Sequence, residues 1–106
     1  MFPPEVTHKI DGTIHVVTVR GEVDIHSSPA LVDALRKVSE AERLIVDLTE
    51  CRYIDSSVFS ALLCARKEFK GEMRLVVREG CNIRRVIAIT QLDKIIPVVS
   101  TLDEAI

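Results

Sequence analysis

Aromatic side chains are scarce in this sequence of 106 residues, which contains three Phe, one Tyr and no Trp. So few rings offer no platform on which single-stranded bases could stack. An excess of charge of one sign is also lacking, because 14 Lys and Arg face 16 Asp and Glu and give a formal net charge of −2. The basic residues are spread along the chain rather than clustered, so we expect no direct binding to nucleic acid.

Long apolar runs are missing as well, and none approaches the ~20 residues that a transmembrane helix requires. The first residues, MFPPEVTHK, contain two prolines and a glutamate where a signal peptide would have a basic start and an apolar stretch. We therefore expect no association with a membrane and a cytoplasmic location. At this length the chain is predicted to form one domain, residues 1–106, with a single core.

The residues that usually hold metals and nucleotides do not occur in the required patterns. The three cysteines are Cys51, Cys64 and Cys81. They form no C-x-x-C pair and have no histidine at ligand spacing, so we interpret them as reduced core or surface thiols. The histidines at 8, 15 and 26 show no metal-ligand spacing either. The four glycines are isolated and build no phosphate-binding loop, so we expect no cofactor and no metal.

Alternating and helical patterns follow one another along the chain. Residues 6–21 read as two strands joined by Asp11-Gly12, a pair that favours a type I′ hairpin. A first helix is expected from Ser28, as N-cap before Pro29, with Leu31, Leu35 and Val38 on one face. Residues 44–48 are almost continuously apolar, which is typical of a central strand that is covered on both faces.

The second half repeats this alternation. Val58, Leu62, Ala65 and Phe69 share one face of a second helix that should stop near Gly71, and Phe59 and Leu63 widen its apolar stripe as core or as a docking patch. A strand at 73–78, a helix capped by Asn82, an edge strand around Pro97 and a short final helix follow. The sequence predicts an α/β fold with one mixed sheet, opened by a hairpin, and about four helices.

The segment Asp55-Ser56-Ser57 joins the central strand to the second helix. The simplest interpretation is an N-cap, because short oxygen side chains accept hydrogen bonds from the free N–H groups of a first turn. A serine there is also a candidate switch, because the positive end of the helix accommodates an attached phosphate. Open α/β sheets place their functional sites at this carboxyl edge, where Asp24 is expected to lie too.

A hydrolase with Ser56, His26 and Asp24 is a competing hypothesis. In a strand, Asp24 and His26 would project to the same side without being aimed at each other. Ser56 also lacks the G-x-S-x-G elbow that exposes a nucleophilic serine. We therefore expect no enzymatic activity, and interpret Asp24 as an acid that orders its loop and His26 as a solvated residue.

Two motifs make the chain resemble the STAS domain, and especially the free-standing anti-sigma factor antagonists of bacteria. GEVD followed by SSPALVDAL resembles the family's G-E-[LV]-D stretch and first helix, and LIVDLTECRYIDSSV resembles its central strand and D-S-[ST]-G-L segment. The resemblance implies that Ser56 is the phosphoacceptor and that Asp24, Asp55 and Ser57 belong to the switch surface.

The same resemblance implies the partners. An anti-sigma factor with serine kinase activity would be bound by the unphosphorylated chain, which frees a sigma factor for transcription, and a serine phosphatase would reset the switch. Val58 stands where the family usually has glycine, and a β-branched side chain beside the acceptor bears on the rate of phosphorylation. The alternative is a STAS partner module of a sensory or transport assembly that is not phosphorylated.

Overall fold

The computed structural model describes residues 4–38 and 40–106 and contains one five-stranded sheet in the order β1-β2-β3-β4-β5. The strands are β1 (Glu5–Asp11), β2 (Ile14–Val23), β3 (Arg43–Ile54), β4 (Glu72–Val76) and β5 (Val98–Val99). The helices are α1 (Ser28–Arg36), α2 (Ser56–Glu68), α3 (Asn82–Thr90) and α4 (Leu102–Ala105), with a 3₁₀ turn at Leu92–Lys94. Among the strands in the described residues, β1 alone is antiparallel to its neighbour. The predicted α/β class, mixed sheet and four helices are confirmed.

The opening hairpin is confirmed, but its loop differs from the prediction. Asp11 pairs with Ile14, so the loop is Gly12-Thr13 rather than Asp11-Gly12. Gly12 has φ +62°, and Thr13 is not among the described residues with positive φ. A type I′ turn needs positive φ at both loop residues, whereas type II′ needs it only at the first, where glycine is favoured. The glycine is therefore placed one position earlier in the loop than the Asp-Gly pattern indicated.

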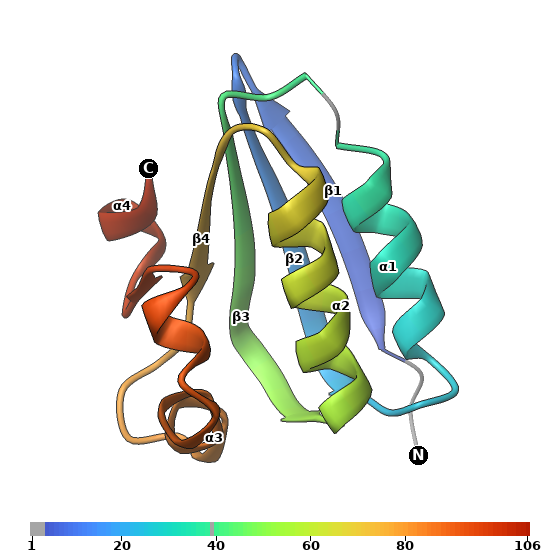
Figure 1. Ribbon diagram of the computed structural model, residues 1–106, viewed down its shortest axis with the longest axis vertical. Helices are drawn as coiled ribbons and strands as arrows, with labels where there is room; N and C mark the ends of the chain where they lie inside the picture. Colours follow the sequence, from blue (N-terminus) through green and yellow to red (C-terminus); the bar gives the residue numbers. More distant parts are fainter. Residues whose placement is uncertain (1–3, 39) are drawn as a thin grey trace.

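One face of the sheet carries the main core. Figure 1 shows α1 and α2 side by side over this face. Leu31, Leu35 and Val38 are buried beneath α1, and Val58 and Leu62 beneath α2, as the periodicities predicted. The apolar face of α3 enters the same cluster through Ile83 and Ile87. Burying such side chains contributes ~1.5–3 kcal/mol each to folding, so these three helices hold their places mainly by packing.

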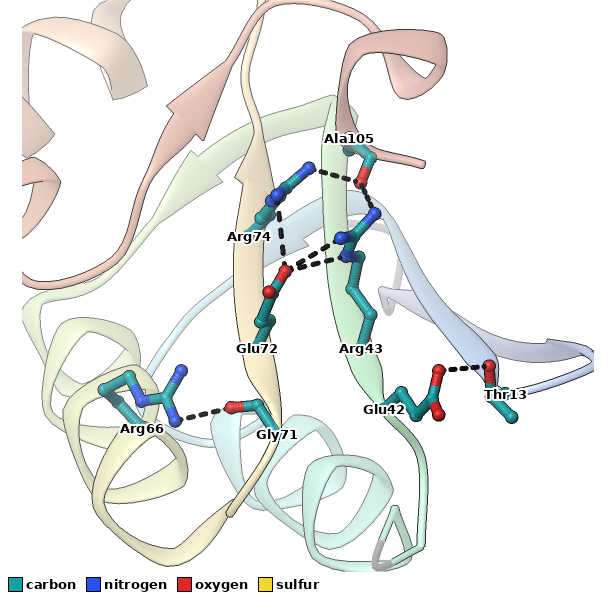
Figure 2. Close-up of polar contacts among 8 residues, drawn as sticks. All are labelled: Thr13, Glu42, Arg43, Arg66, Gly71, Glu72, Arg74 and Ala105. Atoms are coloured by element: carbon teal, nitrogen blue, oxygen red, sulfur yellow. Dashed lines mark hydrogen bonds and ion pairs between the residues drawn. The ribbon is translucent and has the colours of Figure 1, made fainter.

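The opposite face of the sheet is covered at β3 and β4 by α4. Ile45 and Val76, which alternate along their strands with the main-core residues, are fully buried against Ala105. Figure 2 shows how the end of the chain is fixed: Arg43 and Arg74 both donate to the carbonyl oxygen of Ala105, at 3.3 and 3.1 Å, and both contact Glu72. The strand of residues 44–48 is thus buried on both faces, as predicted.

Two predicted helix caps are wrong by one residue. Ser27, not Ser28, is the N-cap of α1, and Ser28 begins the helix with Pro29 in its first turn. Cys81, not Asn82, is the N-cap of α3, and its side chain makes no capping hydrogen bond. Cys81 has the extended backbone of an N-cap, with φ −83° and ψ 160°, whereas the backbone of Ser27 is already α-like, with φ −99° and ψ −14°. Local sequence preference does not determine the start of a helix to one residue.

The end of α2 is fixed by the side chain of Arg66. Arg66 donates to the carbonyl oxygen of Phe69 at 2.9 Å. It also donates to that of Gly71 at 2.7 Å, a bond shown in Figure 2. The helix stops before Gly71, as predicted, and the reason for glycine there is a close approach. A Cβ on Gly71 would lie 2.5 Å from the carbonyl oxygen of Glu42. Within the described residues, no helix has the length and apolar character needed to span a membrane.

Candidate functional site

The parallel pairing of β2 and β3 brings two predicted site residues to one edge of the sheet. Val23 is paired with Ile54 at the ends of these strands, and each is followed by an aspartate. The backbone N–H of Asp55 donates to the carbonyl oxygen of Val23 at 2.8 Å, which continues the ladder by one step. Asp24 and Asp55 therefore leave the sheet next to each other at its carboxyl edge, and α2 starts from that point.

Asp55 is the residue that caps α2. Its backbone is extended, with φ −78° and ψ 159°, and its Oδ1 accepts a hydrogen bond from the backbone N–H of Ser57 at 2.9 Å. A carboxylate in this position satisfies a free donor and also faces the positive end of the helix dipole. Ser56 is the first helical residue. The N-cap interpretation of the segment is therefore correct for the aspartate and not for the serines.

The two serine hydroxyls have different surroundings. The side chain of Ser56 is exposed, and its Oγ has one weak contact as donor, at 3.4 Å from Oδ1 of Asp55. The Oγ of Ser57 is buried and has no hydrogen-bond partner among the described residues. The sequence placed Ser57 on the switch surface, but its hydroxyl lies in the interior. At this helix start, the hydroxyl that a reagent or a partner can reach is that of Ser56.

Asp24 orders the loop that leads into α1. Its Oδ1 accepts from the hydroxyl of Ser27 at 2.9 Å and from the backbone N–H groups of Ser27 and His26 at 3.0 Å. These hydrogen bonds, the one from the Ser27 hydroxyl above all, lower the pKa of Asp24. The carboxylate is therefore ionised at neutral pH, and the edge beside Ser56 carries a fixed negative charge.

A Ser-His-Asp arrangement is not assembled at this edge. The carboxylate of Asp24 binds the backbone N–H of His26 and not its ring. Within residues 4–38 and 40–106, no hydrogen bond joins His26 to Ser56. A general base must be within hydrogen-bond reach of the hydroxyl that it activates and must itself be oriented by a third group. Neither condition is met by these side chains.

Val58 does not crowd the hydroxyl of Ser56 with its side chain. It is fully buried in the main core, so the branched side chain that stands in place of the family glycine points inward. The expectation of a side chain beside the acceptor is therefore wrong. Phe59 is 8% exposed and Leu63 packs against the same core, so the widened stripe of α2 is mainly core and not a docking patch.

Two exposed apolar side chains at the same edge were missed by the sequence reasoning. Ile25, in the loop after Asp24, is 63% exposed, and Tyr53, near the end of β3, is 49% exposed. The register of the β2–β3 pairing shifts between Gly21 and Glu22. At this point the side chains of β3 no longer alternate regularly between the two faces of the sheet. A bulge of this kind changes which side chains face outward and has no reliable sequence signal. Single exposed apolar side chains are normal on a protein surface, so these two do not by themselves define an interface.

Comparison with known proteins agrees with this architecture. The profile of the STAS domain matches residues 5–105. An anti-sigma-B factor antagonist of Listeria monocytogenes is 33% identical over 91 residues, which cover 81% of this chain and 80% of that protein. A STAS-domain containing protein of Pseudomonas aeruginosa is 27% identical over 88 residues, or 80% of this chain and 87% of that protein.

A solved structure shows the same arrangement of strands and helices. The crystal structure of an anti-sigma factor antagonist from Mycobacterium paratuberculosis superimposes with a TM-score of 0.88 at 29% identity, and the match covers 96% of this chain and 90% of that one. The family profile extends over both the hairpin and the final helix, and therefore includes the edge that carries Asp24, Asp55 and Ser56. The chain belongs to the STAS domain family.

Proposed function

We propose that this protein is an anti-sigma factor antagonist whose binding surface is the sheet edge around Ser56 and whose switch is phosphorylation of Ser56. In its unphosphorylated form it binds an anti-sigma factor that is also a serine kinase, and so releases a sigma factor for transcription. Phosphorylation ends the complex, and a serine phosphatase restores it. The protein acts in the cytoplasm as ligand and substrate, and catalyses no step itself.

The observation that carries this proposal is the separation of two tasks at the start of α2. Asp55 supplies the cap, so the exposed hydroxyl of Ser56 is not needed to hold the helix. A serine with a free hydroxyl at a helix N-terminus can accept a phosphoryl group without loss of a structural hydrogen bond. The helix dipole and the unpaired N–H groups of the first turn favour the added negative charge.

The same site explains how a phosphate would change binding. Phosphorylation adds about −1.5 to −2 charges at neutral pH. Asp24 and Asp55 already carry negative charge at this edge, so a partner that fits the unphosphorylated surface would meet a much stronger negative field. Like charges brought together at an interface cost several kcal/mol. Each ~1.4 kcal/mol weakens binding tenfold, which is sufficient to separate a complex of moderate affinity.

The relatives support the choice of partner. The Listeria protein and the Mycobacterium protein are named as antagonists of anti-sigma factors, and the former covers four fifths of this chain. We transfer that role to this chain because the matched segments include both halves of the carboxyl edge.

The test is phosphorylation in vitro. The protein is incubated with ATP and the candidate anti-sigma factor kinase from the same organism, and the modified residue is located by mass spectrometry. We expect one phosphate, on Ser56, and none in Ser56→Ala. Ser57→Ala is the matched control and should be phosphorylated like the wild type, because the hydroxyl of Ser57 is buried.

Phosphate on another residue would remove Ser56 from the switch. If the protein binds a partner that has no kinase activity, and no cognate kinase phosphorylates it, the alternative of a STAS partner module in a sensory or transport assembly would be favoured.

A further inference from the structure

The two edges of the sheet differ in how they are protected. At one edge, β5 has only two residues, Val98–Val99, and α4 follows it. At the other edge, β1 presents seven residues, Glu5–Asp11, and no further strand pairs with it in the described part of the chain. Figure 1 shows β1 at the border of the sheet beside α1. A long unpaired edge offers a row of free backbone N–H and C=O groups to another strand.

The hairpin determines which backbone groups of β1 are free. Asp11 and Ile14 flank a two-residue loop, so they form the hydrogen-bonded pair that closes the turn. Hydrogen-bonded and non-hydrogen-bonded pairs alternate in an antiparallel ladder. Residues 5, 7, 9 and 11 therefore bond to β2, and the backbone groups of Val6, His8 and Ile10 point outward. Any added strand must use these outward groups.

The charges on β1 select one antiparallel register for a second copy of the same strand. With Thr7 opposite Thr7, the outward groups of Val6 meet those of His8, and Glu5 lies opposite Lys9 twice. If His8 were paired with His8 instead, Glu5 would lie opposite Asp11. If Val6 were paired with Val6, no acidic residue would lie opposite Lys9. Opposite charges across a strand pair stabilise it, and like charges destabilise it.

The residues that would pair are available. Glu5 and Lys9 are exposed, and Lys9 has no ion pair among the described residues. Glu5 contacts Arg20 through Oε1 at 3.3 Å, which leaves Oε2 for another cation. Ile10, 65% exposed, would come opposite Pro4 and lose contact with water. A lysine on an edge strand normally prevents pairing, but here the same strand carries its neutralising acid at the matching position.

The neighbouring helix has the same self-complementarity. A groove of about 540 Å³ runs between β1 and α1, with Val6 and His8 on the strand side. On the helix side it is bordered by Ala30, Asp33, Ala34 and Lys37. A two-fold axis through Thr7 would bring two α1 helices together in antiparallel orientation. The small alanines allow close approach, and Asp33 of each copy would face Lys37 of the other.

We propose that β1 is a homodimerisation edge, at which two copies pair antiparallel about Thr7 to form one continuous sheet. The occupant is a second copy because one strand and one helix supply both members of each charge pair. An isologous contact of this kind closes on itself and leaves no further edge of β1 free.

Analytical ultracentrifugation of the full chain over a range of concentrations tests the proposal. We expect a reversible monomer–dimer equilibrium for the wild type. Lys9→Glu places Glu5 opposite a second acid, and Glu5→Lys places two lysines opposite each other, so each should weaken the dimer by about tenfold or more. An equimolar mixture of the two variants should associate again, because each supplies the charge that the other lacks. Lys67→Glu, on α2, is the control. It changes the net charge as Lys9→Glu does, but away from β1, and should dimerise like the wild type.

Three results would overturn the proposal. The first is a wild type that stays monomeric up to ~1 mM, a range that includes weak association. The second is dimerisation of the Lys9→Glu variant with wild-type affinity. The third is a mixture that associates no better than its components, which would show that the charges do not face each other. Thermal melts check that each variant is folded. Glu5→Lys also removes the exposed ion pair with Arg20, which should change the stability of the monomer little.

Discussion

Replacement of Asp55 by alanine tests whether the cap and the switch are separate residues. The change removes the hydrogen bond from the backbone N–H of Ser57 to Oδ1, at 2.9 Å, and a carboxylate from the start of α2. Loss of an N-cap costs about 0.5–2 kcal/mol, and loss of the charge adds ~0.3–1 kcal/mol. We expect Asp55→Ala to lower the free energy of unfolding by about 1–2 kcal/mol. For a chain of this size that corresponds to roughly 4 °C in Tm per kcal/mol.

Two further variants complete the comparison, with urea denaturation as the assay. Asp55→Asn retains an oxygen acceptor without the charge, so it should lose only about 0.3–1 kcal/mol. Ser56→Ala removes an exposed hydroxyl with one contact at 3.4 Å and should stay within about 0.5 kcal/mol of the wild type. A loss for Ser56→Ala as large as that for Asp55→Ala would mean that Ser56 is part of the cap and that cap and switch are not separate residues.

Three other outcomes follow from the structure. A thiol reagent should modify exposed Cys64 well before Cys51, whose pKa burial raises to about 11, and peptide mapping would show the order. The pKa of His8 is lowered by burial and by nearby His15 and Lys37, so the unfolded chain binds the proton more readily. Stability should therefore fall as the pH drops below ~6.5, and less so in His8→Ala, as measured by urea titration at each pH. Gly71→Ala should cost about 1–3 kcal/mol in the same assay, because its Cβ would meet the carbonyl oxygen of Glu42.

The order of elements could be predicted from the sequence because it depends on periodic burial. Leu31 and Leu35 under α1, and Val58 and Leu62 under α2, are all in the core where their spacing placed them. The final helix was also found, and Thr101 caps it through its side chain. Such patterns repeat over several residues, so an error at one position does not change the result.

Features that depend on single backbone positions could not be predicted in the same way. The exact caps of α1 and α3 and the loop of the hairpin each differ by one residue from the expectation. The role of Arg66 depends on carbonyl groups that converge only after the chain turns at Gly71. A charged residue in a mixed segment gives no sign of such a contact, since the simplest interpretation is a solvated face.

The candidate site contains features that could be predicted from the sequence and features that could not. The capping role of a carboxylate next to two serines follows from local chemistry, and the adjacency of Asp24 and Asp55 follows from parallel pairing of β2 and β3. The difference between the exposed hydroxyl of Ser56 and the buried hydroxyl of Ser57 depends on how α2 is rotated against the sheet. That rotation is set by tertiary packing and is not contained in the D-S-S pattern.

Titration calorimetry with the anti-sigma factor compares its affinity for two forms of this protein, unmodified and phosphorylated on Ser56. We expect a complex with the unmodified form, and a dissociation constant at least about a hundredfold higher for the phosphorylated form, corresponding to ~2.7 kcal/mol of repulsion at the interface. Equal affinity of the two forms, with unchanged melting temperatures, would contradict this expectation and would mean that the partner binds away from Ser56.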